Sequence, residues 1–405
     1  MVVATDVRYW RQQLGSQQRI FAMLSFLRNN DIDIKVFFLG ELDSADSDAI
    51  SRHSFDVVPA SAMEVKPTLG THWRRLVNKV RISLDKVLGM AVAYISSSTI
   101  DDTPCLAQLV NPKREDAFVR FIRQQQPDIL LMQYLRTSYL AERLLKRVDK
   151  SFLLCIDTHD IQYIRYQRFI QQGSKANLRI TQAEEHRVLK HYDLVLAIQQ
   201  QDYRQYCDLG LENVLYVPHA VTVKPQAEPQ SSKVSIGFIG SSMTANVHGI
   251  TQFVKNIWPR LASDRFELNI YGNVCQQLDF DDPTITLHGF AEQLEDCYRN
   301  NHIIINPIEL GSGLKIKSVE ALCFGRALLT TPTGVEGMPI TDEVPFLICD
   351  SDEQWLNGIE ALACHDYRLE MQQRAIRYGQ SNYSTQAAFG GLLEKLHRPL
   401  HEAGN

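Results

Sequence analysis

Short apolar runs alternate with amphipathic stretches along nearly the whole chain, which is typical of doubly wound α/β domains with parallel sheets. Six runs with strand character occur in the first half and six in the second. They are residues 1–7, 34–40, 128–134, 151–157, 193–198 and 214–221, then 233–240, 266–272, 285–290, 302–308, 326–332 and 346–350. Each series predicts one sheet, so we expect an α/β protein with two sheets.

A polar segment with prolines and no apolar period, residues 223–233, separates the two series. Such a composition favours an interdomain linker, which places the boundary near residue 228. We therefore expect domains over residues 1–228 and 229–384. Residues 385–405 contain an amphipathic helix that follows the last predicted strand, and we expect it to pack back on the first domain. The least regular part of the pattern is residues 41–110.

The composition agrees with two globular domains. The chain has 405 residues, of which 44% are hydrophobic and 22% charged, and its formal net charge of -5 argues against a nucleic-acid binder that relies on bulk positive charge. Its eight cysteines are scattered singly, as expected for reduced thiols in a cytoplasm. We find no signal sequence, and the longest apolar run, residues 87–95, is too short to span a bilayer. We expect a cytoplasmic protein, free or at the inner face of the membrane.

One basic stretch stands out in the irregular part. Residues 72–86 combine a helical pattern with several Lys and Arg side chains. Two interpretations remain open, a solvated helix face and a basic surface for peripheral contact with an anionic membrane or a charged acceptor.

The segment after the predicted strand 302–308 carries the clearest chemical signal. A Gly-Ser-Gly turn leads into a predicted helix that starts at Ser312 or Gly313 and has Lys315 and Lys317 in its first turn. Cations at a helix N-terminus cost about 0.3 to 1 kcal/mol each unless an anion is present. A strand, a glycine turn and a helix in this order form a phosphate site at the carboxyl edge of a parallel sheet. The alternative is that Lys317 pairs with Glu320 while Lys315 points into water.

A second candidate loop follows the strand 233–240. Gly240 and Ser241 are small residues at the strand end, where the backbone can approach a phosphate closely. The segment has G-x-x-G without the full G-x-G-x-x-G, and no acidic residue ends a second strand about 20 residues later, which disfavours a nicotinamide oxidoreductase. An ordinary tight turn is the alternative for Gly240 alone.

Two further groups follow strands of the first series. His159 comes directly after the strand that ends in Asp157, with Asp160 and Arg165 nearby, so we expect it at the carboxyl edge of the first sheet, facing a cleft. An exposed turn histidine is the alternative. Gly15 lies in the first turn between strand and helix, with Ser16 as the expected N-cap and Arg19 one turn further.

Together these segments resemble a known family. The stretch GSGLKIKSVEALCFGRALLTTPTGVEGM resembles the donor-site signature of retaining GT-B glycosyltransferases, specifically glycosyltransferase family four, the glycosyl transferases group 1. Residues 236–261 resemble the family's first donor-domain strand, glycine loop and helix, and residues 184–202 its last acceptor-domain helix and strand. Residues 213–221 resemble the Pro-Asn-Gly-Val element with His219 in place of Asn. The resemblance covers about residues 150–385 and implies two Rossmann-like domains facing each other across a cleft.

The resemblance also implies roles for the donor-site residues. It makes Glu320 the ligand of the ribose hydroxyls and assigns the diphosphate to Lys315 or Lys317. The family's E-x7-E pattern needs an acid where this chain has Ser312, and Glu309 is out of register. The sugar contact is therefore expected from Ser312 or Glu309, or from the backbone at Gly313 and Leu314. Gly240 and Ser241 complete the donor site.

In similar proteins a histidine at the position of His159 lies under the transferred sugar, where it stabilises a cation-like transition state. A neutral imidazole suits this role, so we expect activity to fall below pH of about 6.5. The residues expected at the acceptor or the cleft are Gly15, Arg19, Asp160, Arg165 and His219.

The expected activity is transfer of a sugar from a nucleotide-diphosphate sugar to an acceptor hydroxyl with retention. The acceptor would be a carbohydrate, lipid-linked or protein molecule in bacterial-type polysaccharide, glycolipid or glycoconjugate synthesis. We expect no cofactor and no metal, because Asp31-Ile-Asp33 and Asp279-Phe-Asp281 lack the strand-end context of a metal site. The alternatives are a nucleotide-sugar epimerase on the same architecture and a non-catalytic nucleotide-sugar-binding module.

Overall fold

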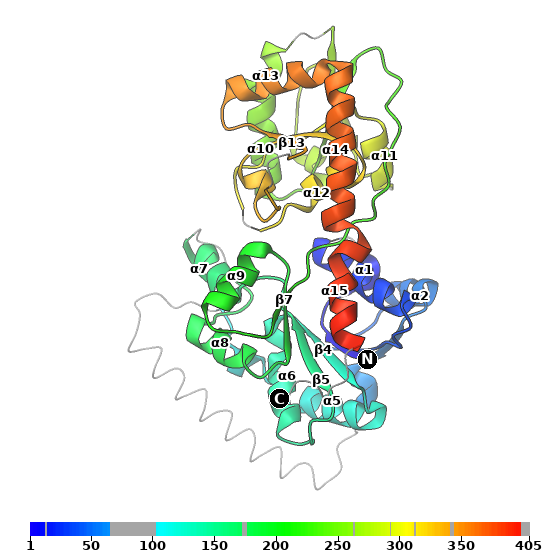
Figure 1. The fold of residues 1–405 in the computed structure, drawn as a ribbon, viewed down its shortest axis with the longest axis vertical. Helices are drawn as coiled ribbons and strands as arrows, with labels where there is room; N and C mark the ends of the chain where they lie inside the picture. The colour runs from blue at the N-terminus through cyan, green and yellow to red at the C-terminus, as the bar shows by residue number, and fades with distance from the viewer. Residues whose placement is uncertain are drawn as a thin grey trace. The chain divides into compact units, whose positions relative to one another are not determined.

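A computed structural model describes residues 1–12, 14–64, 103–171, 176–261, 264–291, 293–311, 313–340 and 344–397. The chain divides into two compact units, each built around one sheet (Figure 1). The first contains Met1–Ile198 and Asp202–Leu215, and the second contains Tyr216–His397 with Gln199–Gln201. The basic stretch 72–86 lies outside the described residues.

The first unit has a seven-stranded sheet in the order β3-β2-β1-β4-β5-β6-β7. Its strands are β1 (Val2–Thr5), β2 (Lys35–Phe38), β3 (Asp56–Pro59), β4 (Ile129–Gln133), β5 (Leu153–Asp157), β6 (Leu194–Ala197) and β7 (Val214–Tyr216). Its helices are α1 (Gly15–Asn29), α2 (Ser44–His53), α4 (Leu106–Leu109), α5 (Pro112–Gln125), α6 (Ser138–Leu145), α7 (Gln162–Gln171), α8 (Gln182–Leu189) and α9 (Gln200–Asp208).

All six strands expected in the first half are present, and the pairings from β3 to β6 are parallel. The sequence pattern missed α2 and β3, which lie in the part expected to be irregular. β3 is only four residues long, and its burial is at most partial. It lies at the edge of the sheet, where the apolar signal of a buried strand is weak.

The second unit has a six-stranded sheet in the order β10-β9-β8-β11-β12-β13. The strands are β8 (Val234–Ile239), β9 (Phe266–Tyr271), β10 (Ile285–Gly289), β11 (Ile303–Asn306), β12 (Ala327–Thr330) and β13 (Phe346–Ile348). The helices are α10 (Thr244–Asn256), α11 (Leu294–Arg299), α12 (Ile316–Cys323), α13 (Asp352–Ala363), α14 (His365–Tyr383) and α15 (Thr385–His397). All six strands expected in this half are confirmed.

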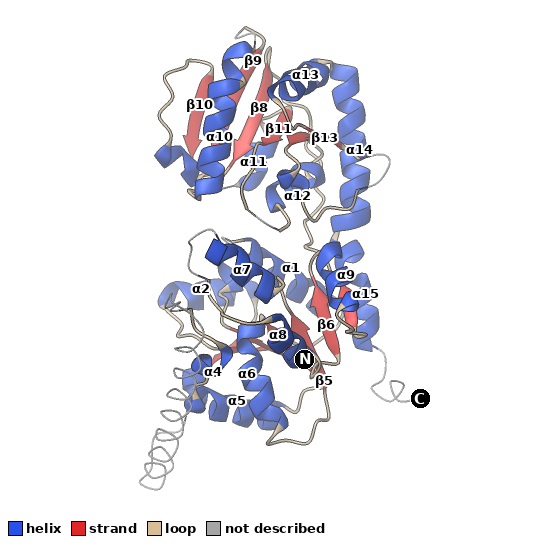
Figure 2. Ribbon diagram, turned by 90° about the vertical axis from the view of Figure 1, so that its left-hand side faces the viewer, coloured by secondary structure: helices blue, strands red, loops and turns tan. Residues whose placement is uncertain are grey.

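Helices pack against the sheet of the second unit (Figure 2). Side-chain alternation along its strands builds a core on each face of this sheet. On β11, Ile303 and Ile305 pack into the core shared with α10 and α13, while Ile304 packs into the core shared with α12 and α14. Burial of both faces explains why these strands read as continuous apolar runs.

The strand order of each sheet reverses beside its first strand. In the first sheet the reversal lies between β1 and β4, and in the second it lies between β8 and β11. Loops that leave the carboxyl ends of these neighbouring strands diverge to opposite faces, so a crevice forms there that commonly binds ligands. These two places, one in each unit, are therefore where ligand sites are expected.

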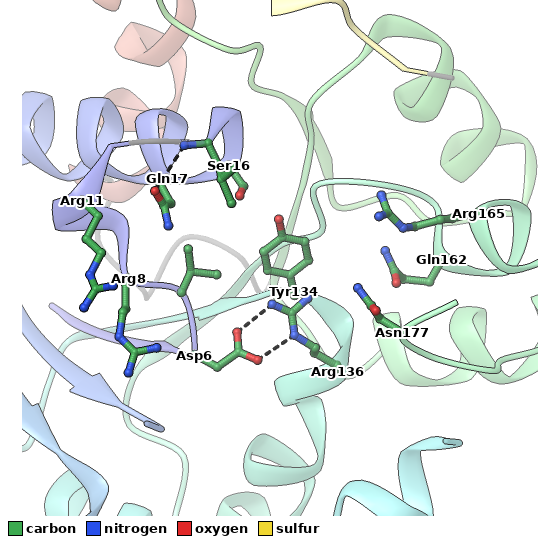
Figure 3. A pocket seen from close by; sticks show the side chains of 12 residues that line it. Asp6, Arg8, Arg11, Ser16, Gln17, Tyr134, Arg136, Gln162, Arg165 and Asn177 are labelled. Atoms are coloured by element: carbon green, nitrogen blue, oxygen red, sulfur yellow. Dashed lines mark hydrogen bonds and ion pairs between the residues drawn. The ribbon is translucent and has the colours of Figure 1, made fainter. Parts of the chain in front are cut away.

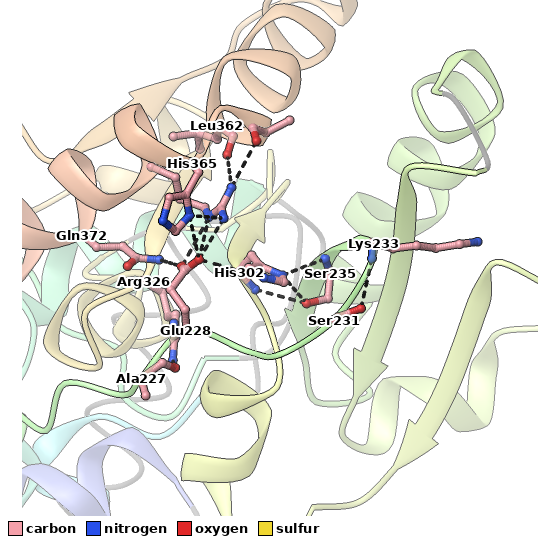
Figure 4. A network of polar contacts seen from close by, with 12 residues as sticks. Ala227, Glu228, Ser231, Lys233, Ser235, His302, Arg326, Leu362, His365 and Gln372 are labelled. Atoms are coloured by element: carbon pink, nitrogen blue, oxygen red, sulfur yellow. Dashed lines mark hydrogen bonds and ion pairs between the residues drawn. The ribbon is translucent and has the colours of Figure 1, made fainter.

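The segment expected as a linker has no helix or strand from residue 217 to 231. Its end is held against the second unit by a polar network (Figure 4). The Glu228 carboxylate accepts hydrogen bonds from Arg368 at 2.8 Å and from Gln372 at 2.5 Å, and buried Arg326 donates to the Ala227 carbonyl at 2.6 Å. No helix among the described residues is both long and apolar enough to cross a membrane.

Candidate active site

The loop between β11 and α12 has the strand, glycine turn and helix order that the sequence predicted. Gly311 and Gly313 both have left-handed backbone angles, with φ of 107° and 83°. Such angles cannot continue a right-handed helix, so α12 begins at Ile316 with Lys315 as its N-cap, later than the predicted start at Ser312 or Gly313. Ser312 itself lies outside the described residues. Leu314 is half-buried against the core around α12 and α14.

Lys317 joins the two predicted phosphate loops. Its ammonium donates a hydrogen bond to Asn246 Oδ1 at 2.5 Å, and the Asn246 amide donates to the carbonyl and hydroxyl of Ser241, both at 3.0 Å. Lys317 Nζ also lies 4.8 Å from the centre of the Phe238 ring. Burial lowers the pKa of Lys317 to about 7, and the opposing effect of the Glu320 charge is smaller than the loss of hydration.

Lys315 is held differently. Its ammonium donates to the Gly313 carbonyl at 2.7 Å and lies 3.5 Å from the Glu336 carboxylate. The alternative in which Lys315 points into water is therefore wrong. The two lysines bring two cationic side chains to the start of α12, which has no acidic residue in its first turn. This arrangement favours an anion there.

Glu320 lies one turn further along α12 and is 9% exposed. It accepts a hydrogen bond from the Tyr298 hydroxyl at 3.0 Å. Burial raises the pKa of Glu320 to about 7, against the opposing effects of that hydrogen bond and of the Lys317 charge. Glu309, in contrast, is exposed. Glu320 thus occupies the low-dielectric side of the lysine site, where a hydroxyl donor would stabilise its ionised form.

Gly240 ends β8 in a turn with no room for side chains. A Cβ atom on Gly272 would lie 2.2 Å from the Gly240 carbonyl oxygen, and Gly272 has a left-handed φ of 96°. The Gly240 amide donates to the Tyr271 carbonyl at 3.0 Å, which ties the turn to β9. The tight backbone packing keeps Gly240 and Ser241 at the carboxyl edge beside Lys317.

In the first unit, His159 follows β5 and is 6% exposed. The alternative of an exposed turn histidine is therefore wrong. Its Nε2 lies 2.7 Å from Gln133 Oε1 and 3.4 Å from the Asp157 carboxylate. Both neighbours are acceptors, so the neutral ring carries its proton on Nε2 and leaves Nδ1 as an acceptor.

Burial also overturns the expected pH dependence of His159. Burial lowers its pKa to about 4, although the Asp157 charge opposes this shift. The imidazole therefore stays neutral well below pH 6.5, and the expected loss of activity near pH 6.5 does not arise from this residue.

Two residues of this edge have strained backbones. Tyr134, which follows β4, has φ of 68°, and His159 has φ of 63°. Their rings stack with centroids 3.9 Å apart and planes 7° from parallel. The Arg136 guanidinium lies 3.9 Å from the Tyr134 ring centre. Two flat groups this close to one ring must lie on opposite faces, so Tyr134 separates Arg136 from His159. Positive φ at such residues is costly and commonly found at functional sites.

A buried ion pair between Arg19 and Asp157 stabilises the carboxyl edge of the first sheet. The Arg19 Nε and a terminal nitrogen donate to the two Asp157 oxygens at 3.1 and 2.9 Å, and both side chains are fully buried. Arg19 was expected at the acceptor or the cleft. In the structure its side chain is fully buried and orients the Asp157 carboxylate. Ser16 does not cap α1, because Leu14 holds the N-cap position and its amide bonds to the Gln17 side chain at 3.2 Å.

A cavity of about 520 Å³ opens at the strand reversal of the first sheet (Figure 3). Its lining residues come from the segment after β1, from the start of α1, from the segment after β4, from α7 and from the loop after α7: Asp6, Val7, Arg8, Arg11, Leu14, Ser16, Gln17, Tyr134, Arg136, Gln162, Arg165 and Asn177. Of the expected cleft residues, Arg165 lines it and pairs with Asp160 at 2.7 Å. Gly15 lies between two lining residues, whereas His219 is buried in the second unit.

Sequence reasoning missed Arg8, Arg11, Tyr134 and Arg136. A signal was present, since Arg8, Arg11 and Arg136 follow the carboxyl ends of predicted strands and Tyr134 is the last residue of one. Among the residues that the structure describes, no three His, Cys, Asp or Glu side chains gather in a way that could hold a metal ion.

Two units, each with a parallel doubly wound sheet and polar groups at its carboxyl edge, define the GT-B fold. Residues 233–365, all within the second unit, match the family model for glycosyl transferases group 1. No curated protein sequence matches the chain.

Solved structures with the same fold cover almost the whole chain. The Anabaena HepE complex with UDP and glucose is 10% identical, with a TM-score of 0.64 over 98% of this chain and 99% of that one. S. aureus TarM in complex with fondaparinux, α-GlcNAc-glycerol and UDP is 11% identical, with a TM-score of 0.65 over 98% and 99%. Sucrose-phosphate synthase from Thermosynechococcus elongatus is 12% identical, with a TM-score of 0.64 over 98% of each chain.

Proposed function

We propose that this protein is a glycosyltransferase that moves a sugar from a nucleotide-diphosphate sugar to an acceptor hydroxyl with retention of configuration. The observation that carries the proposal is the contact of Lys317 with Asn246, which joins the two phosphate loops at the strand reversal of the second sheet. The family match of residues 233–365 and the UDP named in the HepE and TarM structures support a nucleotide-sugar donor.

In this proposal the second unit binds the donor. Lys317 and Lys315 take the diphosphate together with the free amides at the start of α12. Glu320 accepts hydrogen bonds from the ribose hydroxyls. In the free protein its carboxylate accepts a hydrogen bond from the Tyr298 hydroxyl. Two cationic side chains and a helix N-terminus neutralise the leaving diphosphate, so the proposal includes no metal ion.

His159 provides the chemistry of the first unit. A neutral imidazole with its proton on Nε2 offers the Nδ1 lone pair to a sugar hydroxyl and adds no positive charge beside a cation-like transition state. The Tyr134 ring and the contacts at Nε2 fix its orientation. Retention follows if the leaving diphosphate itself accepts the proton of the acceptor hydroxyl on the same face of the sugar.

The decisive experiment separates donor binding from transfer. Calorimetry with UDP, GDP, ADP and TDP identifies the nucleotide, and Lys317→Met is expected to weaken its binding by about tenfold to a hundredfold, because hydrogen bonds to charged groups are worth about 1.5 to 3 kcal/mol. Glu320→Gln should weaken binding of the nucleoside diphosphate and leave inorganic pyrophosphate unaffected. His159→Asn should lower turnover with nucleotide affinity intact.

Three outcomes would contradict the proposal or its parts. If no nucleoside diphosphate binds, the donor site is wrong. If the cognate nucleotide sugar is converted to its epimer without acceptor, the protein is an epimerase. If it binds and no product forms with any acceptor, the protein is a binding module. The anomeric configuration of the product, read by NMR, tests retention, and turnover in EDTA tests independence of metal.

A further inference from the structure

The cavity of the first unit is dominated by guanidinium groups. Arg8, Arg11, Arg136 and Arg165 all line it, and Asp6 is the single carboxylate in the lining set (Figure 3). Its volume of about 520 Å³ is in the range of a small-molecule site. The lining of this cavity is rich in positive side chains, whereas the chain as a whole has a net charge of -5.

Each of the four arginines forms an ion pair with an aspartate and has further N–H donors outside that pair. Asp6 accepts from Nε and one terminal nitrogen of Arg136, both at 2.7 Å, which leaves the other terminal nitrogen outside the ion pair. The fully buried Asp46 holds Arg8 at 3.0 Å and Arg11 at 2.7 Å. A guanidinium has five N–H donors in a rigid fork, so these pairs orient the groups and leave donors for a second anion.

The carboxylates that hold three of these arginines lie outside the lining of the cavity. Asp46 binds both Arg8 and Arg11, Asp43 binds Arg11, and Asp160 binds Arg165. None of these three acids lines the cavity. A ligand in the cavity therefore meets four guanidinium groups and one carboxylate. The four carboxylates balance the charge of the four arginines, but the lining itself presents more guanidinium donors than carboxylate acceptors. Such a lining favours an anionic ligand, which accepts charge-assisted hydrogen bonds.

The remaining polar lining suits a sugar. Ser16, Gln17, Gln162, Asn177 and the Tyr134 hydroxyl provide neutral donors and acceptors. The position of α7, which carries both Gln162 and Arg165, is fixed by the buried Glu185 carboxylate, which accepts from the Gln162 and Tyr163 amides at 3.0 and 2.8 Å. Groups for hydroxyls and groups for an anion thus line the same small space.

We propose that this cavity binds the acceptor and that the acceptor is an acidic saccharide, whose carboxylate or phosphate contacts the arginines while its hydroxyls contact the amide side chains. This inference rests on the proposed glycosyl transfer. The Tyr134 ring has Arg136 on one face and His159 on the other, so the anion site lies one aromatic ring away from the histidine. A single monosaccharide with an acidic substituent can therefore present its charge to Arg136 and a hydroxyl toward the reaction centre.

The test uses the full chain and three probes. Methyl β-glucuronide, glucose 6-phosphate and the neutral methyl β-glucoside are titrated by calorimetry and by ligand-observed NMR, at low and high salt. We expect one or both acidic probes to bind, the neutral one to bind at least about tenfold more weakly, and salt to weaken the binding of the acid. The two acidic arms distinguish a carboxylate from a phosphate.

Variants assign the binding to the cavity. Arg136→Gln and Arg165→Gln are each expected to weaken binding of the acidic probe by about tenfold to a hundredfold, and Arg136→Lys to retain part of it. The matched control is Arg187→Gln, which removes an exposed arginine of the same unit whose partner Glu142 lies at 3.4 Å. Thermal unfolding of every variant separates lost binding from lost folding, and the Arg→Lys variant keeps the ion pair with Asp6.

The outcomes are distinct. Equal binding of the neutral and acidic probes, or unchanged binding in both Arg→Gln variants, would overturn the inference. So would a loss of UDP affinity in these variants as large as the loss for the acid, since the cavity would then hold the donor phosphates. Failure of the glycosyl transfer itself appears differently, as binding of the acid with no release of UDP from any UDP-sugar in its presence or absence.

Discussion

Binding of a nucleoside diphosphate should be accompanied by proton uptake at Lys317. Burial lowers the pKa of this ammonium to about 7, so a large fraction of the side chain is neutral in the free protein at neutral pH. A diphosphate beside Lys317 favours the charged form and raises the pKa again. The protein must then take up a proton when the ligand binds.

The magnitude follows from the position of the pKa. At pH 7 about half of the Lys317 side chains are protonated in the free protein, and at pH 8 only about a tenth. If the bound diphosphate restores a pKa near that of an ordinary lysine, uptake is about half a proton at pH 7 and about 0.9 at pH 8. The dissociation constant then rises by about fivefold from pH 7 to pH 8 and by nearly tenfold per pH unit above that. At pH 8 the nucleotide's own phosphates are ionised and contribute little.

Calorimetry in buffers of different ionisation enthalpy measures this uptake. UDP, or whichever nucleotide binds, is titrated at pH 8 in PIPES, HEPES and Tris, and the slope of apparent enthalpy against buffer enthalpy gives the number of protons. Lys317→Arg is the matched variant, because an arginine stays charged, so it should bind the ligand without uptake. Glu320 also has a pKa of about 7, so the measurement is repeated in Glu320→Gln, which cannot titrate at this position.

A zero slope at pH 8 in a wild-type protein that binds the nucleotide would refute the argument. So would an equal slope in Lys317→Arg, because the proton would then enter elsewhere. Uptake that disappears only in Glu320→Gln would assign the titration to the carboxylate and leave the lysine permanently charged.

Two further predictions concern the edge of the first sheet. The pKa of His159 lies near 4 in the folded protein and about 6.5 when unfolded, so its contribution to stability is constant above pH 6.5 and is lost as pH falls from 6.5 toward 4. His159→Asn is the comparison, because Asn tolerates the left-handed φ at this position. Between pH 7.5 and 5 the free energy of unfolding, measured with urea, should fall by about 2 kcal/mol more in the wild type than in this variant. Parallel pH profiles of the two proteins would contradict this. Asp157→Asn leaves the fully buried Arg19 without its ionised partner and should lower the free energy of unfolding by about 3 to 5 kcal/mol. Glu142→Gln, at a largely exposed ion pair, should lower it by less than about 1 kcal/mol. Similar losses at the two sites would contradict a special contribution of the buried pair.

The overall architecture could be predicted from the sequence because each strand of a buried parallel sheet is a continuous apolar run in the local sequence. Twelve apolar runs predicted twelve of the thirteen strands that the described residues form, and the missing one is the short, partly exposed β3. The candidate donor residues were also accessible, because Lys315, Lys317 and Glu320 lie in one continuous segment with a glycine turn before it. The start of that helix was misplaced, since the left-handed angles at Gly311 and Gly313 are a property of the folded loop.

The electrostatic state of the site could not be predicted in the same way. His159 was expected to titrate near pH 6.5, and the structure lowers its pKa to about 4 because the ring is buried between Tyr134 and the end of β5. The degree of burial depends on how loops from several strands pack over the ring. A residue's neighbours along the chain do not contain that information.

By itself, then, the sequence determined two parallel sheets, the loops that follow their strands and the order of strand, glycine turn and helix around α12. The tertiary structure alone decided which of these loops meet. It joined Lys317 to Asn246, placed Arg136 beside Asp6 across 130 positions of the chain, and gathered four arginines into one cavity. Hydrophobic periodicity is a local property that sets each element, whereas the contacts between distant loops depend on strand order and packing, which no single segment encodes.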